Sequence, residues 1–98
     1  MILEIAEFRV LADRADEFPA AVEHGLQYVA ATPGFRTARL TRSIESPSRF
    51  VLLIEWDTVE AHTKAFRESA NFGKWRSVVG PFFDGAPTVE HAEITVSR

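Results

Sequence analysis

The 98-residue sequence contains no cysteine, no long apolar run and no surplus of positive charge. Without cysteine the chain forms no disulfide, presents no thiolate nucleophile and offers no cysteine ligand for zinc or an iron–sulfur cluster. No run approaches the roughly 18 apolar residues that a membrane-spanning helix needs. The formal net charge of −3 leaves no basic surface for nucleic acid or for an anionic membrane. These absences favour a small or neutral partner.

The sequence also lacks the short motifs of several enzyme classes. It contains no HExxH, no GxSxG, no glycine-rich phosphate loop and no cluster of paired carboxylates, so hydrolase, phosphoryl-transfer and dinucleotide-dependent activities have no support. Its three histidines have no metal-ligand spacing, and no metal site is predicted. Residues 1–5 lack the basic segment and long apolar stretch of a signal peptide, so a cytoplasmic protein is expected.

The residues that are present fit one small domain spanning residues 1–98. Charges in the first apolar segment, at Glu4, Glu7 and Arg9, indicate a strand with one wetter side. β-Branched and aromatic residues between turn signals predict strands over residues 2–10, 35–44, 49–56 and 89–96.

Three helical segments are predicted between these strands. Asp16 is placed to cap the first, which carries an apolar stripe from Phe18 to Val29. The second begins at Asp57, where a glutamate follows three residues later, and the third covers residues 70–79. The order β-α-β-β-α-α-β predicts a ferredoxin-like α+β fold of the split βαβ type, with an antiparallel four-stranded sheet and a divided second helix.

Residues 49–56 form the most apolar strand, and apolar side chains occupy both of its faces. The helices of so short a chain can cover only one face of a small sheet. A second copy of the same sheet is the simplest cover for the other face, so a homodimer is predicted. A cavity is expected where packing between the sheet and the helices is incomplete.

The first candidate for chemistry is His62, on the second predicted helix. It shares an inward face with Val59 and Phe66, while Arg67 points away. An inward histidine is either a hydrogen-bonded core residue or a base or proton carrier in a pocket. Spacing alone leaves both interpretations open.

Arg76 is the second candidate, because it lies in an aromatic stripe with Phe72 and Trp75. An inward guanidinium must be paired or reach water. It therefore either forms a structural ion pair, with Glu55 or with an acid of a partner chain, or it stabilises an anion in a cavity.

Trp56 is the third candidate, since it ends the apolar strand with an N–H that needs a partner. It is either a core or interface aromatic or part of a site. Asn71, His24 and His91 give weaker signals, and both of these histidines are expected at the surface or at an interface.

Four short motifs occur in a fixed order along the chain: Pro33-Gly34-Phe35, Glu55-Trp56, Ala61-His62 and Ser69-Ala70-Asn71-Phe72. Together they resemble the antibiotic biosynthesis monooxygenase (ABM) domain family, from the first strand to the last. The resemblance implies a dimeric α+β barrel in which two sheets pack across the subunit interface. Better-known members oxidise anthrones and hydroquinones with molecular oxygen and use no flavin, haem or metal.

The resemblance also implies site residues by position. Trp56 matches the strand-end tryptophan of the polyketide anthrone oxygenases, and Arg76 matches their pocket arginine. His62 stands where those enzymes have tyrosine and many other members have histidine. Leu52 replaces an asparagine that contacts substrate, which departs from the anthrone pattern. A haem-degrading branch has a histidine and an asparagine where this chain has Arg76 and Phe8, so haem degradation is disfavoured.

The implied function is a cofactor-independent monooxygenase that oxidises a small aromatic hydroquinone or anthrone-like phenol. Trp56 would orient a substrate oxygen, His62 would accept or relay a phenolic proton, and Arg76 would hold the resulting anion and peroxide. The alternative is a dimeric-barrel protein that binds a small molecule, or an isomerase or cyclase that uses no oxygen. The expected walls of the pocket are Leu52, Phe66, Phe72 and Trp75.

Overall fold

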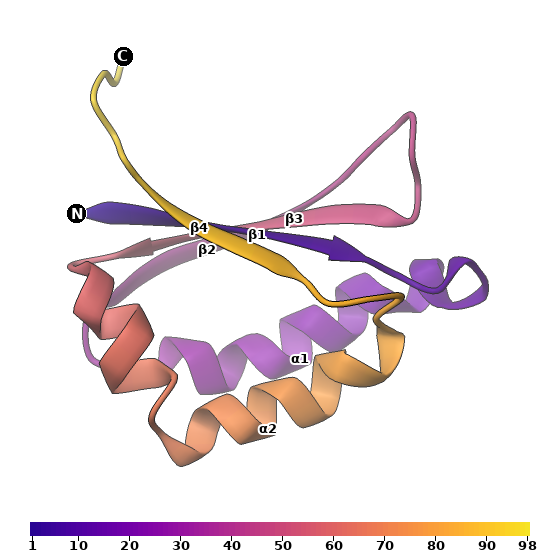
Figure 1. Ribbon diagram of the computed structural model, residues 1–98, viewed down its shortest axis with the longest axis horizontal. Helices are drawn as coiled ribbons and strands as arrows, with labels where there is room; N and C mark the ends of the chain where they lie inside the picture. Colours follow the sequence, from indigo (N-terminus) through magenta and orange to yellow (C-terminus); the bar gives the residue numbers. More distant parts are fainter.

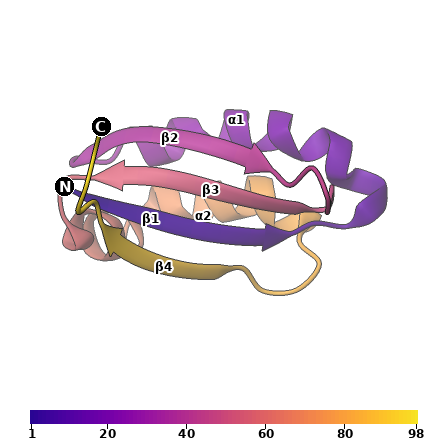
Figure 2. The ribbon, with the colours of Figure 1, turned by 90° about the horizontal axis from the view of Figure 1, so that it is seen from above.

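An antiparallel sheet with the strand order β2-β3-β1-β4 forms one layer of the protein. The computed structural model describes residues 1–98, and Figure 2 shows the strand order from above the sheet. This topology, with the helices on one side of the sheet (Figure 1), confirms the predicted ferredoxin-like α+β fold. The strands are β1 (Ile2–Arg9), β2 (Phe35–Arg42), β3 (Arg49–Trp56) and β4 (Thr88–Glu93).

Three strands end earlier than predicted, and β1 stops one residue short, at Arg9. β4 stops at Glu93, whose partner in the sheet is Ile2, the first residue of β1. Residues 94–96 therefore leave the sheet, and Figure 1 shows the chain rising away from it toward the C-terminus. β2 stops at Arg42, and the hydrogen-bonded turn to β3 begins at Ser43.

The helices form the second layer. Asp16 lies inside a 3-10 turn and forms an ion pair with Arg42 of β2 (2.9 Å). The prediction that Asp16 caps the first α-helix is therefore wrong, because that helix begins at Phe18. No helix is long and apolar enough to cross a membrane. The helical elements outside the β3–α2 connection are η1 (Ala12–Glu17), α1 (Phe18–Ala30), α2 (Ala70–Val79) and η3 (Gly80–Phe82).

The connection from β3 to α2 contains a π-helical turn, η2 (Ala61–Phe66), where a regular helix was predicted. The hydroxyl of Thr58 accepts the N–H of Ala61 (3.1 Å) and so begins this segment. Asp57, where the second helix was expected to begin, instead pairs with Arg36 (2.8 Å). π-Turns inside helices occur frequently at functional sites, and this one carries His62.

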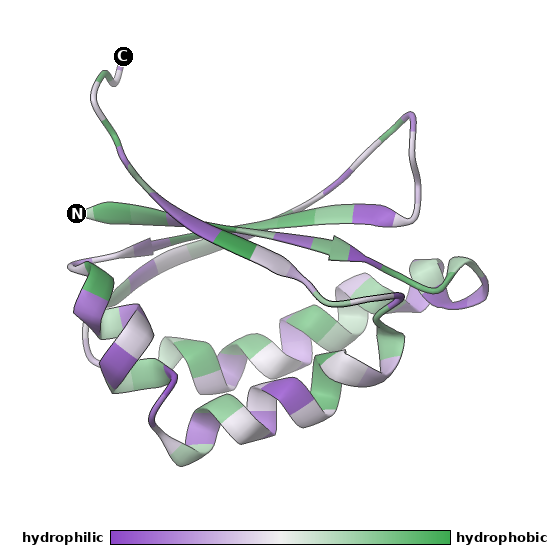
Figure 3. Ribbon diagram, viewed as in Figure 1, coloured by the Kyte–Doolittle hydropathy of each residue, from purple (hydrophilic) through white to green (hydrophobic).

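The side chains between the two layers form one hydrophobic core. Alternate residues of β3 point into it, and each is at most 2% exposed. Figure 3 shows apolar residues on both the sheet and the helices that face it. The largest fully buried members are Phe18, Val22 and Val29 of α1, Phe50, Leu52 and Trp56 of β3, and Val10 and Val79.

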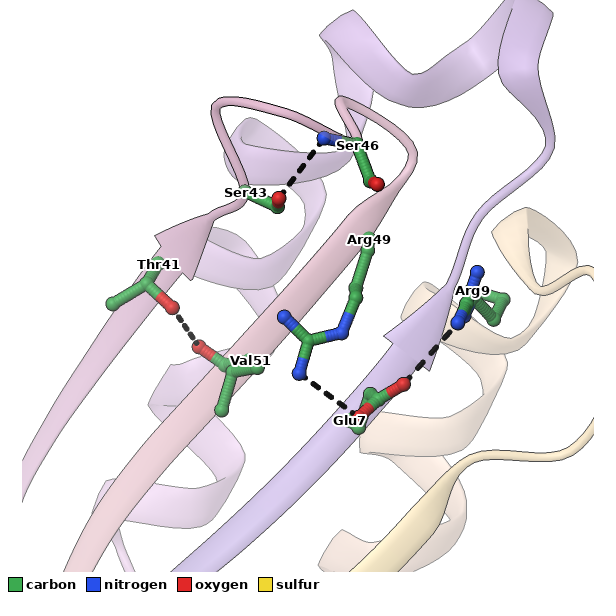
Figure 4. Close-up of polar contacts among 7 residues, drawn as sticks. All are labelled: Glu7, Arg9, Thr41, Ser43, Ser46, Arg49 and Val51. Atoms are coloured by element: carbon green, nitrogen blue, oxygen red, sulfur yellow. Dashed lines mark hydrogen bonds and ion pairs between the residues drawn. The ribbon is translucent and has the colours of Figure 1, made fainter.

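The opposite face of the sheet has no helix over it (Figure 1). Glu7 of β1 accepts a hydrogen bond from Arg49 (3.1 Å) and pairs with Arg9 (3.5 Å) on this face (Figure 4). β3 is thus apolar on both faces, as predicted, and one face is open in the single chain. The half-buried apolar residues of this outer face are Leu3, Ile5, Val51 and Leu53.

Gly34, in the Pro33-Gly34-Phe35 motif, joins α1 to β2 with a positive φ of 92°. A Cβ at this position would lie 2.6 Å from the Cβ of Ala61, at the start of η2. We expect Gly34→Ala to lower the free energy of unfolding, measured by urea denaturation, by at least about 2 kcal/mol. The left-handed backbone costs a non-glycine residue ~1–2 kcal/mol, and overpacking adds ~1–3 kcal/mol.

Gly73→Ala is the matched control, because no atom lies within 4 Å of the added Cβ in α2. In a helix interior, glycine is less stable than alanine by about 0.5–1 kcal/mol. The Gly73→Ala variant should therefore be at least as stable as the wild type. Wild-type stability of Gly34→Ala would contradict the account of the turn.

Candidate active site

A cavity of about 370 Å³ lies between the helix-facing side of the sheet and the η2 and α2 segments. Its walls are mostly apolar, and residues 85–87 and Val89 complete them. Six of the seven site residues predicted from the sequence line this cavity, and Trp56 does not. The six are Leu52, His62, Phe66, Phe72, Trp75 and Arg76.

Trp56 is fully buried at the end of β3. Its indole N–H donates a hydrogen bond to Oε1 of Glu4 (2.9 Å). Its ring stacks on the imidazole of His62, with centroids 5.6 Å apart and planes inclined by 18°. Trp56 is therefore a core aromatic that contacts two polar groups of the cavity and does not itself reach the empty space.

Glu4 belongs to the site although its sequence context did not single it out. It is 6% exposed and points toward the helices from β1, in line with Ala6 and Phe8. The expectation that Glu4 shares a wetter side with Glu7 is wrong, because residues three apart on a strand face opposite sides of the sheet. The alternation through Ala6 and Phe8 is the signal that identifies Glu4 as inward.

His62 links Glu4 to His91. Its Nε2 lies 3.4 Å from Oε1 of Glu4, and its Nδ1 lies 2.8 Å from Nε2 of His91. His91 pairs with Glu4 in the register of β4 and β1, so both side chains are on the helix-facing side. His91 is half-buried on the edge strand, and its contact with His62 was not predicted, whereas His24 is exposed as expected. His62 is both a hydrogen-bonded buried residue and part of the cavity wall.

Burial moves the pKa values of the two central groups in opposite directions. It raises the pKa of the Glu4 carboxyl, and the hydrogen bond from Trp56 and the charge of Arg67 oppose that rise. It lowers the pKa of His62 to about 4, with Arg67 and His91 acting in the same direction. At neutral pH, His62 is therefore an uncharged imidazole with one ring proton.

Arg67 lines the cavity, although a regular helix would point it away. The backbone N–H of Arg67 donates to the carbonyl of His62, five residues earlier (3.0 Å). A π-turn holds one more residue than an α-helical turn, which rotates the residues that follow it. The same turn therefore brings His62 and Arg67 to one side.

Arg76 lies at the rim of the cavity and is exposed to solvent. Its guanidinium carbon is 5.9 Å from the ring centroids of both Phe72 and Phe83. No ion pair within the chain involves Arg76, and Glu55 lies in β3 on the outer face of the sheet. The pair with Glu55 is therefore not formed, and the charge is free to meet an anion in the cavity.

The polar groups form a chain through the site and do not converge on one point. His62 uses opposite ring nitrogens for its contacts with Glu4 and His91. Ligands of one metal ion would direct their donor atoms to a common centre. The arrangement is instead suited to holding and moving a proton beside an apolar space.

Comparison with known proteins adds the family. A protein of Bacillus subtilis (strain 168), the uncharacterized YczJ, is 31% identical over 91 residues, which cover 93% of this chain and 96% of YczJ. A solved structure from Bordetella bronchiseptica, named provisionally as an antibiotic biosynthesis monooxygenase, is 37% identical with a TM-score of 0.93 and 97% coverage of both chains.

The fold is also that of SnoaB, a cofactor-independent oxygenase from Streptomyces nogalater. Its TM-score is 0.82 at 16% identity, with 98% of this chain and 94% of SnoaB covered, so the likeness is one of fold. The sequence pattern of the family named antibiotic biosynthesis monooxygenase matches residues 1–78. The chain therefore belongs to the antibiotic biosynthesis monooxygenase (ABM) family, as its motifs indicated.

Proposed function

We propose that this protein is a cofactor-independent monooxygenase that oxidises a small aromatic hydroquinone or anthrone-like phenol with molecular oxygen. The observation that carries the proposal is the apolar cavity of about 370 Å³ that holds both a buried neutral imidazole and a guanidinium without an ion-pair partner. The fold shared with SnoaB, itself a cofactor-independent oxygenase, supports the same class of reaction.

The two polar groups have complementary tasks in this reaction. His62 accepts or relays the phenolic proton, because a neutral imidazole is a proton acceptor. Arg76 holds the resulting anion and the peroxide that forms with oxygen, since a permanent cation beside an apolar space stabilises developing negative charge. An electron-rich phenolate passes an electron to oxygen by itself, so the protein needs to supply only binding and electrostatics.

Trp56 takes a different part from the one its sequence position implied. Its indole N–H, the only donor of the side chain, is donated to Glu4, so Trp56 acts on the substrate through that carboxyl and through the orientation of His62. The aromatic ring of the substrate packs between apolar side chains. These walls are Leu52, Phe66, Phe72 and Trp75.

A second copy of the chain is proposed to cover the outer face of the sheet, which makes the working unit a homodimer. Support comes from the apolar side chains that β1 and β3 present on that face without cover from a helix. Stable homodimer interfaces are built from such apolar patches. The cavity lies on the other side of the sheet, so the dimer would stiffen the strands that carry Glu4 and Trp56.

The function is tested by oxygen consumption of the metal-free protein with reduced hydroxyanthrones and hydroquinones, corrected for autoxidation. We expect catalysed uptake by the wild type and at least a tenfold loss of turnover in Arg76→Ala, since removal of one charge-stabilising group costs about 10²–10³ in rate in other enzymes. Lys74→Ala, which removes an exposed cation of the same helix away from the cavity, is the matched control and should keep wild-type turnover.

Unchanged turnover in Arg76→Ala would remove Arg76 from the mechanism. Saturable binding across the panel without any oxygen uptake would contradict the oxygenase and favour a non-oxidative pocket.

The dimer is tested by sedimentation of Leu53→Glu, which places a charge in the centre of the outer face. We expect a folded monomer, because burying an unpaired carboxylate in an apolar interface costs several kcal/mol. Ala20→Glu, on an exposed position of α1, should sediment as the wild type does. A wild-type protein that sediments as a monomer at micromolar concentration would refute the proposed assembly.

A further inference from the structure

Glu4 is the only acidic side chain that lines the cavity, and two other side chains contact its carboxyl group. Its Oε1 accepts the indole N–H of Trp56 (2.9 Å) and lies 3.4 Å from Nε2 of His62. Its Oε2 has no hydrogen-bond partner in the protein, yet no fully buried polar atom is left without one. Oε2 is therefore reachable from the cavity, where a substrate hydroxyl would meet it.

The short contact between the two histidines allows two positions for the ring proton of His62, and the neighbouring Glu4 favours one of them. One proton must lie between Nδ1 of His62 and Nε2 of His91, which are 2.8 Å apart. If His91 donates it, the single proton of neutral His62 is on Nε2 and points to Glu4. The opposite tautomer would aim a lone pair at a carboxylate, which is unfavourable. Donation from His91 therefore points the N–H of His62 toward Oε1 of Glu4, 3.4 Å away, beside the N–H that Trp56 donates.

We propose that Glu4 is the general base of the cavity, which takes the phenolic proton on Oε2, and that Trp56, His62 and His91 are positioning residues that hold Glu4 as a carboxylate. This inference rests on the proposed function and deepens it, because the role of proton acceptor passes from His62 to Glu4. His91 acts on Glu4 indirectly. Its hydrogen bond to Nδ1 of His62 favours the tautomer in which the N–H of His62 points toward Oε1 of Glu4.

The proton balance of the reaction closes on Glu4. The phenolic O–H gives its proton to Oε2, and the substrate anion transfers electrons to oxygen and forms a carbon–oxygen bond, giving a peroxide anion. Glu4 returns the proton to that anion. The hydroperoxide then loses its terminal OH with the remaining hydrogen on the same carbon as water, which leaves a carbonyl. One oxygen atom stays in the product, and Glu4 ends as the carboxylate that it was.

The surroundings of Glu4 suit a group that must first accept a proton and then release it. Burial raises the pKa of Glu4 and so makes its carboxylate a stronger base, while the hydrogen bond from Trp56 and the charge of Arg67 oppose that rise. The other titratable or charged groups near Glu4 are His62 and Arg76, which line the cavity, and His91, which lies beside Glu4 on β4 and contacts His62. Because the base must be deprotonated, the activity should rise with pH through the pKa of Glu4.

The base is tested without turnover by binding a hydroxyanthraquinone, whose phenol changes colour on ionisation and whose ring carbons are already oxidised. We expect the bound probe to show the phenolate spectrum with the wild type at pH 7 and the neutral spectrum with Glu4→Gln. The amide oxygen of Gln keeps an acceptor for Trp56 but cannot take a proton. Glu7→Gln is the matched control, since it makes the same change in β1 on the outer face (Figure 4) and should behave as the wild type.

The positioning role is tested by the ¹⁵N shifts of the histidine rings. The wild type should show His62 protonated at Nε2, and His91→Ala should show a mixture of both tautomers. In His91→Ala the acid limb of the kcat/KM profile should move up by about one pH unit, because each N–H donor that a carboxylate loses raises its pKa by roughly that amount. A merely structural His91 would leave this limb where it is.

The results separate the inference from the function on which it rests. A neutral bound probe in the wild type, a phenolate spectrum that persists in Glu4→Gln, or a His62 proton on Nδ1 would each overturn the role of Glu4. Oxygen uptake that survives in Glu4→Gln would do the same while leaving the oxygenase intact. An ionised probe that depends on Glu4, in a protein without oxygen uptake, would support the base and refute the oxygenase.

Discussion

The hydrogen bond between the carboxylate of Glu4 and the indole of Trp56 (2.9 Å) is the contact on which the rest of the site depends. A carboxylate that leaves water needs partners, because an unpaired buried charge costs several kcal/mol or more. Trp56 from β3 donates to this carboxyl group, His62 from η2 lies 3.4 Å from it, and His91 from β4 hydrogen-bonds to His62. Three strands and the π-turn are thereby fixed around one acidic group.

Much of the fold follows from local patterns. Residues 49–56 form the predicted strand and residues 70–79 the predicted helix, because their composition agrees with their place in the core. Six predicted site residues also gather around one cavity. Arg67 is exposed, as predicted, but its place in the cavity wall was missed because an extra residue in a π-turn leaves no mark in the sequence. His91 was missed because its neighbours depend on the register of β4 with β1, a contact between the two ends of the chain.

The two faces of the sheet carry different features, the cavity on the helix-facing side and an uncovered apolar surface on the outer side. The helix-facing side places acid–base groups at one end of an apolar space and guanidinium groups around it, which suits an aromatic substrate that becomes an anion. The outer face carries apolar side chains flanked by the Glu7–Arg49 pair, which suits association with a second copy. Alternation along β1 assigns Glu4 to the first task and Glu7 to the second, although both are glutamates three residues apart.

The most direct test of the proposed chemistry follows the fate of oxygen atoms in the metal-free protein. A good substrate would be turned over under ¹⁸O-labelled oxygen gas, and the mass of the product would be measured. The account predicts one labelled atom in the product, with the other released as labelled water. A product that carries no label, or labelled hydrogen peroxide as the only fate of the gas, would contradict it.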